Sequence, residues 1–405
     1  MQKKLIALAV AGLASTGAFA QSNVTVYGVA DATFDVVRAS NVKDGYDLGN
    51  TTRVSTNSSY LGFKGAEALG NGLTAVFQFE SGVGFDNNGS FGATRDSFVG
   101  VSGGFGTVVM GKLTGPTRAL GGAIDVNSGS TGIGSNGGLI GKLGNNLISG
   151  GAAGGTANYG AAGTNAAAAS PVVGSCGRST ICVSLFDDRW TNAIAYVSPS
   201  FAGLSATVAY VANEAKAFHG AATSQNIRGF DSGLKYANGP IMAAVTYNAV
   251  SLGNDANTDV SNFRVGGSYD FGMASIRALF DRTRGDHLLA GVGSVTQNVF
   301  GLGGTFNVTP AGKLIAQAYF ARDLKGDAAA AVKKDTGAKL FEVGYEHSLS
   351  KRTILKAVYA HLNNDNNASY DFGINAVGLG SAPAASLNGQ GASLNGVQLG
   401  LRHSF

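Results

Sequence analysis

The stretch LTAVFQFE, Leu73–Glu80, decides the fold class because its apolar and polar residues alternate. One face carries Leu73, Ala75, Phe77 and Phe79, and the other carries Thr74, Gln78 and Glu80. A period of two is typical of a β-strand, in which successive side chains point to opposite faces of the sheet. The stretch therefore predicts a strand with one apolar face.

Segments of this kind, each about ten residues long, recur along the chain and are separated by turn residues. About ten residues is the length at which a tilted strand crosses a membrane, and the connections alternate between short turns and long polar loops. The pattern predicts an all-β fold, a transmembrane antiparallel β-barrel of about 16 strands. The strands are expected near residues 22–37, 54–66, 73–83, 93–103, 106–113, 188–198, 204–213, 228–237, 241–250, 262–271, 274–284, 296–306, 313–322, 338–348, 353–363 and 395–405.

The composition supports this interpretation. Glycine accounts for 62 of 405 residues, proline for only 6, and charged residues for 13%. Each glycine costs a helix roughly 1 kcal/mol relative to alanine, whereas strand ends and turns accept it. A secreted β-sandwich also has alternating strands, but those run about five or six residues. Aromatic residues near the segment ends also favour a membrane barrel; they are Phe63, Phe79, Phe271, Phe306, Tyr345, Tyr359 and Phe405.

Residues 1–20 have the features of a secretory signal peptide. Lys3 and Lys4 precede an apolar run, and Ala18-Phe19-Ala20 forms a small-residue cleavage site. Removal of this segment leaves residues 21–405 as one barrel domain. Export implies an oxidising compartment, so Cys176 and Cys182 are expected to form a local disulfide.

The longest connection spans residues 113–187 and contains tracts rich in glycine, alanine and serine. A barrel of about 16 strands has a lumen wide enough for such a loop to fold inward and narrow it. A disordered extracellular tract is an equally good interpretation of residues 150–170.

Several charged residues are predicted to face the lumen. If Leu61 and Phe63 face lipid, alternation turns Tyr60 and Lys64 inward. A lysine or arginine facing lipid at mid-membrane would cost roughly 2–4 kcal/mol. The same parity argument places Arg264, Lys356 and Arg402 on the lumen side, with acids such as Asp31, Glu80 and Asp231, and several of these are expected to form ion pairs in the wall. The formal charge of +4 includes no basic cluster, which argues against a nucleic-acid partner.

The chain resembles, from end to end, the general trimeric porins of Gram-negative outer membranes, which are 16-stranded barrels. The resemblance rests on QSNVTVYG at residues 21–28, LGFKGAEALGNGL at 61–73, FVGVSGGFGTV at 98–108, NAIAYVSPSFAG at 192–203 and GLRHSF at 400–405. It implies a homotrimer in outer-membrane lipid that passes ions and small hydrophilic solutes. It also implies that Phe405 serves as an assembly signal for the outer-membrane insertion machinery.

The resemblance further implies a mid-height constriction between a basic wall and an acidic third loop. By position, Arg95 and Arg189 match wall arginines, Lys64 matches a wall lysine, and Lys112 stands where arginine is usual. Tyr60 departs from the pattern, because arginine normally precedes Leu-Gly-Phe. The loop's acidic cluster is reduced to Asp125, with Arg118 nearby. A moderate anion preference is therefore predicted.

The sequence argues against an enzyme. Its five histidines, His219, His287, His347, His361 and His403, belong to neither a nucleophile-elbow nor a metal-binding motif, so no catalytic residue, metal or cofactor is expected. A substrate-specific channel is the alternative, but it needs an aromatic ladder, and Tyr27 and Tyr60 are too few. The sequence leaves open an additional role as an adhesin.

Overall fold

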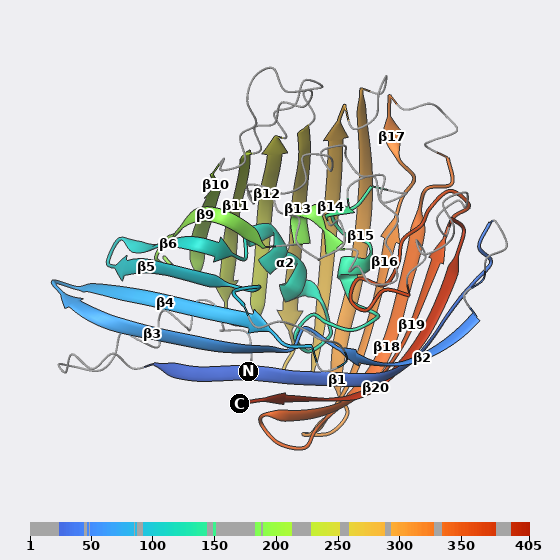
Figure 1. The fold of residues 1–405 in the computed structure, drawn as a ribbon, viewed down its shortest axis with the longest axis horizontal. Helices are drawn as coiled ribbons and strands as arrows, with labels where there is room; N and C mark the ends of the chain where they lie inside the picture. The colour runs from blue at the N-terminus through green and yellow to red at the C-terminus, as the bar shows by residue number, and fades with distance from the viewer. Residues whose placement is uncertain are drawn as a thin grey trace.

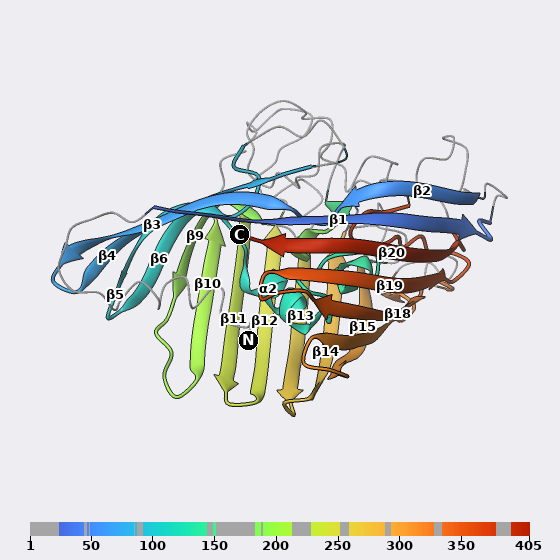
Figure 2. The ribbon, with the colours of Figure 1, turned by 90° about the horizontal axis from the view of Figure 1, so that it is seen from below.

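The computed structural model describes residues 24–43, 47, 49–84, 86, 92–143, 149–150, 183–187, 189–212, 228–251, 259–287, 293–327, 334–377 and 390–405. Its main sheet is antiparallel and closes on itself, because β1 (Thr25–Ser40) pairs with β20 (Ser393–Ser404). The strands surround the helix α2 (Pro116–Ile124), as the two views show (Figures 1 and 2). None of the described helices is long and apolar enough to cross a membrane.

The remaining strands of the barrel follow in chain order. They are β2 (Gly49–Thr56), β3 (Tyr60–Gly70), β4 (Leu73–Gly82), β5 (Ser97–Gly103), β6 (Gly106–Leu113), β9 (Trp190–Val197), β10 (Leu204–Val211), β11 (Arg228–Asn238), β12 (Ile241–Ser251), β13 (Asp259–Asp270), β14 (Ala274–Asp286), β15 (Ser294–Asn307), β16 (Gly312–Ala321), β17 (Lys325–Gly326), β18 (Ala338–Ser348) and β19 (Thr353–Asn364). The long connection after β6 also contains η1 (Asn136–Gly138), a small sheet of β7 (Ser149–Gly150) and β8 (Val183–Ser184), and η2 (Leu185–Asp187).

The predicted barrel of sixteen strands is confirmed. The described sheet has eighteen segments because β2 and β3 share one crossing and β17 is a short pairing on β15. The prediction of one continuous strand over residues 54–66 was wrong, because the strand is interrupted at residues 57–59. Ser58 has φ 55°, a left-handed conformation that breaks the ladder. β1 consequently pairs with β3 in its N-terminal part and with β2 in its C-terminal part.

Alternation places polar groups inside and apolar groups outside, as expected. On β1 the carboxylates of Asp31 and Asp35 are fully buried, whereas Phe34 and Val36 are exposed on the outer face. Short turns lie at the end of the barrel near Phe405, and the long connections lie at the opposite end. In outer-membrane barrels the short turns face the periplasm and the long loops face outward.

Two inward segments fill much of the lumen. The first is the long loop between β6 and β9, of which residues 114–143, including α2, 149–150, 183–187 and 189 are described. The second is the last loop between β19 and β20, whose described residues 365–377 run inward, a course that the sequence did not predict. Tyr370 and Phe372 of the last loop are fully buried in one apolar cluster with Ile133, Leu139 and Ile140 of the long loop. The Arg53 side chain donates hydrogen bonds to the backbone carbonyls of Asn375 and Ala376, which holds the last loop against β2.

Candidate functional site

Two tyrosines and two cations from β1, β3 and the connection before β5 lie together on the lumen wall. The rings of Tyr27 and Tyr60 pack edge to face with centroids 6.2 Å apart. The Arg95 guanidinium lies 4.5 Å from the centroid of Tyr60, and the Lys64 Nζ lies 4.8 Å from that of Tyr27. Each such cation–π contact stabilises by about 0.5–1 kcal/mol at an exposed site. Tyr60, the residue at the position where an arginine was expected, therefore packs against the guanidinium of Arg95.

Glu80 on β4 organises this group. Its carboxylate accepts hydrogen bonds from the Tyr27 hydroxyl at 2.8 Å, the Gln78 amide at 3.1 Å and the Arg95 Nε at 3.2 Å. The Arg95 side chain retains 19% exposure while that of Glu80 retains 9%. The cation is thus the more accessible member of the pair.

Arg189 is linked to this group by Asp96, the residue that follows Arg95. Its Nε donates to Asp96 Oδ2 at 3.0 Å, and the same carboxylate accepts bonds from the backbone N–H and the hydroxyl of Thr114. Burial opposes ionisation of Asp96, but the nearby charges of Arg189 and of Arg118 on α2 hold the pKa of this carboxyl below its usual value. Lys112 on β6 is opposite Ser97 in the ladder, and Ser97 directly follows Asp96 in sequence. Asp96 therefore joins the long loop to the barrel.

More cations continue along β20 and β19. Asp31 accepts from Lys356 Nζ at 2.6 Å and from Arg402 at 3.0 Å, so two cations share one acid. Lys64 forms no salt bridge with any described carboxylate. We call this surface the cationic wall. It comprises the lumen-facing cations Lys64, Arg95, Arg189, Lys356 and Arg402.

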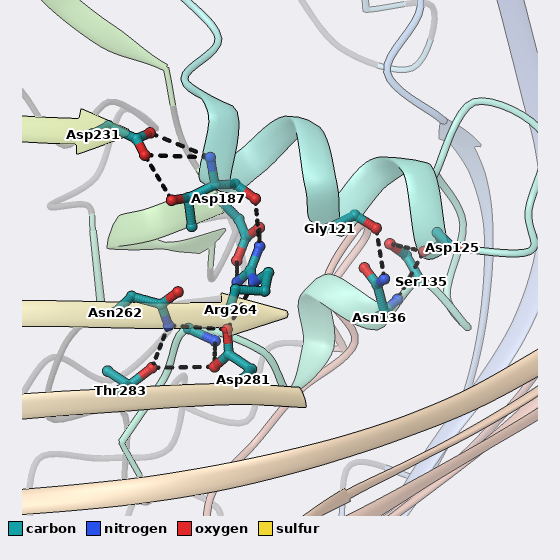
Figure 3. Close-up of polar contacts among 12 residues, drawn as sticks. Gly121, Asp125, Ser135, Asn136, Asp187, Asp231, Asn262, Arg264, Asp281 and Thr283 are labelled. Carbon is teal, nitrogen blue, oxygen red and sulfur yellow. Dashed lines mark hydrogen bonds and ion pairs between the residues drawn. The ribbon is translucent and has the colours of Figure 1, made fainter. Parts of the chain in front are cut away.

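Other strands of the barrel wall, β11, β13, β14 and β18, carry many acids on the lumen side, but the long loop covers them. Arg264 on β13 is fully buried between Asp281, at 2.7 Å, and Asp187 of the long loop, at 2.9 Å (Figure 3). Asp231 on β11 accepts from the Thr117 hydroxyl at 2.7 Å and from the Thr117 backbone N–H at 3.3 Å. A carboxylate at this position caps the first turn of α2, which lacks a side-chain cap of its own.

Asp125 ends α2 and is also enclosed. It is 1% exposed, and its carboxylate accepts bonds from Ser135 and Asn136 (Figure 3) and from Asn127 and Gln317. Glu342 and Glu346 on β18 are buried beside it and accept bonds from Asn127 and Ser128 of the long loop. We call this surface the covered wall. Its charged residues are Asp125, Asp187, Asp231, Arg264, Asp281, Glu342 and Glu346.

The structure brings most of the predicted site residues together. Tyr60, Lys64 and Arg95 are in one group, Arg189 and Lys112 border it, and Asp125 belongs to the covered wall. Sequence reasoning missed that Glu80 and Asp96 are the partners of the two arginines. The sequence Arg95-Asp96 before a strand was the available indication. The predicted signal peptide, Cys176 and Cys182 lie outside the described residues.

Phe405 lies at the end of β20, where the barrel closes. Its backbone exchanges two hydrogen bonds with Gly28, and the residue is 49% exposed. A Cβ at Gly28 would lie 2.5 Å from the Phe405 ring, so only glycine leaves room for it there. Within the described ranges, no group of three or more His, Cys, Asp or Glu side chains could hold a metal ion.

Comparison with known proteins gives concordant results. The family profile described as "Gram-negative porin" matches residues 7–367. The chain is 31% identical over 414 residues to outer membrane porin protein 32 of Delftia acidovorans, with 100% of both chains covered. It is 28% identical to an outer membrane porin protein of Bordetella pertussis, with 90% of this chain and 95% of that protein covered. Among solved structures, it resembles the anion-selective porin from Comamonas acidovorans with a TM-score of 0.69 and 26% identity, covering 95% and 100% of the two chains.

Proposed function

The chain belongs to the Gram-negative porin family, and we propose that it forms a water-filled outer-membrane channel through which small hydrophilic anions diffuse in preference to cations. The family's members are channels, and we propose no enzymatic activity and no cofactor for this one. The proposed ligands are inorganic anions and small organic acids in transit, with no tight binding site for any of them.

The observation that carries this proposal is the unequal exposure of opposite charges. On the cationic wall, Lys64 has no described carboxylate partner, and Asp31 is shared by two cations. On the covered wall, Asp125, Asp231 and Asp281 are each at most 1% exposed. Charges next to water contribute more to the potential felt by a passing ion than charges enclosed by neutralising partners, and rings of charge determine the selectivity of pores. Arg95 and Arg402 are more exposed than the acids they pair with, and Lys64 has no described acid partner, so the accessible surplus at these three residues is positive.

The proposed constriction consists of Lys64, Arg95, Lys112 and Arg189, with Tyr60 and Glu80 holding Arg95 in place. Glu80 and Asp96 offset part of the positive charge, which favours a moderate preference. A substrate-specific channel is not favoured, because Tyr27 and Tyr60 form one pair rather than a ladder along the pore.

Reversal potentials in a potassium chloride gradient across a planar bilayer test the proposal. The wild type should favour chloride. The double variant Arg95→Ala with Arg189→Ala should reverse or abolish the preference, because it removes two cations and leaves the charges of Glu80 and Asp96 without their cationic partners. The exposed turn pair Lys351→Gln with Arg352→Gln is the matched control and should leave the ratio unchanged. A wild-type channel selective for potassium would contradict the proposal.

We further propose that the protein assembles as a homotrimer and that Phe405 is its assembly signal. Phe405→Ser should reduce the amount of heat-labile trimer in the outer membrane without changing export, as immunoblots of unheated and heated membrane fractions would measure. Phe271→Ser, at another exposed aromatic near the same end of the barrel, is the control. Equal losses in both variants would show a general role of interfacial aromatics in place of a terminal signal.

A further inference from the structure

Three polar side chains on the lumen side of β12 and β13 are buried without hydrogen-bond partners. Asn248 and Asn262 are 0% exposed, and Thr246 is 3% exposed. In the described part of the chain, no group bonds to the Oδ1 or Nδ2 of Asn248, the Oδ1 of Asn262 or the Oγ1 of Thr246. Buried polar atoms are nearly always hydrogen-bonded, because burial removes their hydration and something must replace it. These atoms on two adjacent strands therefore indicate a site for a ligand.

The strand register places these side chains next to one another. Asn248 is directly opposite Asp231 on β11 and Asn262 on β13, and opposite residues of antiparallel strands have Cβ atoms about 4.5–5.5 Å apart. The Nδ2 of Asn262 donates to Asp281 Oδ2 at 2.9 Å and to Thr283 Oγ1 at 3.0 Å. These two bonds fix the amide and leave its Oδ1 on the side away from both partners (Figure 3). The amide of Asn248 makes no bond that prevents its oxygen from turning toward a ligand.

The long loop encloses this region. Helix α2 packs against β11, β12 and β13 inside the barrel (Figures 1 and 2). A Cβ at Gly233 would lie 2.7 Å from the Cβ of Pro116 and 3.1 Å from the Cγ2 of Thr246, so the start of α2 lies close to Thr246. Toward the long connections, Val250 and Val260 are opposite each other and belong to a buried apolar cluster. Pore water is thereby kept away from the three polar side chains.

The charge beside these side chains is negative. Asp231 is 0% exposed, and its carboxylate accepts bonds from neutral donors, the N–H and hydroxyl of Thr117 and the Nε1 of Trp190. It forms no salt bridge with any described cation, because Arg264 pairs with two other carboxylates of the covered wall. The N-terminus of α2 offsets only about half an elementary charge. A charge enclosed in this way is costly unless a counter-charge lies beside it.

We propose that Thr246, Asn248 and Asn262, beside Asp231, bind a monovalent alkali-metal cation behind the long loop. Carbonyl, hydroxyl and carboxylate oxygens are the ligands that hard cations prefer. One carboxylate without a cationic partner balances a single positive charge, whereas water would satisfy the amides and leave that charge enclosed. The sequence did not predict this site, because amide and hydroxyl ligands form no recognisable metal motif. The site is separate from the proposed anion path, because α2 lies between it and the open lumen.

Thermal unfolding of the full protein, folded in detergent in either potassium chloride or choline chloride at equal ionic strength, provides the test. The wild type should unfold at a higher temperature in potassium chloride, because a cation that binds only the folded state stabilises it. Asn248→Leu should lose this difference, with the apparent potassium affinity falling at least roughly 10-fold. Leucine breaks no side-chain hydrogen bond at this position, so the variant should fold. Asn248→Asp should bind potassium more tightly than the wild type, because it adds a carboxylate ligand.

Asn57→Leu is the matched control, at another fully buried asparagine whose amide is bonded to Asp31 and Thr33. It should lower the unfolding temperature in both salts and keep the difference between them. Crystals grown in rubidium chloride, with rubidium in place of potassium, should show an anomalous scattering peak between Asn248 and Asn262.

Equal unfolding temperatures of the wild type in the two salts would overturn the proposal, because water alone would then fill the site. A difference between salts that Asn248→Leu retains would overturn it too, since potassium would then act elsewhere on the protein. If the variants fold poorly, the wild-type crystals decide, and the absence of the rubidium peak would overturn the proposal.

Discussion

The cationic wall and the covered wall contain the same kinds of charged residue, but the two sets differ in how far they are exposed to water. On the covered wall, Arg264 is fully enclosed by Asp187 and Asp281, and the contact joins the long loop to the barrel. On the cationic wall, Arg95 is held over Tyr60 and by Glu80, yet its side chain stays 19% exposed. The comparison shows that ion pairs of the same type differ in exposure according to what covers them, and we propose that only the exposed type contributes to the pore potential.

The long loop makes this division. Groups of its helix and of the segment after it donate hydrogen bonds to three carboxylates. Thr117 donates to Asp231, Asn136 to Asp125 and Ser128 to Glu346. Acids that alternation alone would count as pore-lining are thereby withdrawn from solvent. We propose that the loop influences selectivity because it hides this negative charge.

The largest expected effect is on stability, from Arg264→Leu. This change leaves Asp187 and Asp281 buried without their cation, which costs about 3–5 kcal/mol when one partner of a buried pair is removed. The thermal unfolding midpoint of the detergent-solubilised protein should fall clearly. Lys64→Leu is the matched change on the cationic wall and should shift the midpoint little. Equal shifts would mean that the two walls do not differ as described.

A smaller effect should follow from pH through Lys142 of the long loop. Burial lowers the pKa of this amine from 10.5 to about 8, against the opposing attraction of Asp371 and Asp187. Between these values the unfolded chain binds more protons than the folded one, so the free energy of unfolding should rise with pH. The rise is about 3 kcal/mol at most and should level off above the unfolded pKa.

The measurement is thermal unfolding at a series of pH values for the wild type and Lys142→Met. The difference between the two proteins isolates this amine from other titrating groups. Lys351→Met, at an exposed turn residue, should retain the wild-type pH dependence. If the Lys142→Met profile ran parallel to that of the wild type, folding would not lower the pKa of this amine, and the prediction would be wrong.

The smallest expected effect is on ion preference, from Lys64→Gln. Because this cation is partly exposed and lacks a described acid partner, its removal should lower the chloride preference modestly, with only a small loss of stability from the contact with Tyr27. Screening has a length of roughly 8 Å at physiological salt, so the difference from wild type should shrink as salt rises. Reversal potentials at several salt concentrations would measure it, with Lys351→Gln as control. A difference that grows with salt would exclude an electrostatic origin.

Much of this architecture could be predicted from the sequence. The alternation in Leu73–Glu80 and its counterparts is a local property with a period of two, so it determined the strands, their number and the direction of Tyr60, Lys64 and Arg402. It failed at residues 57–59, where the backbone conformation of Ser58 breaks a strand whose side-chain pattern continues. A period reports side-chain direction and is insensitive to a local break in the ladder.

The tertiary structure alone decided which charges reach water. Arg264 meets Asp187 across 77 positions of the chain, and Ser128 meets Glu346 across 218. The inward course of the last loop depends likewise on Arg53, which is 323 positions from Ala376. Strand periodicity extends over a few residues and contains no information about such contacts. Their free energy depends on burial, which arises only when the barrel has closed around both loops.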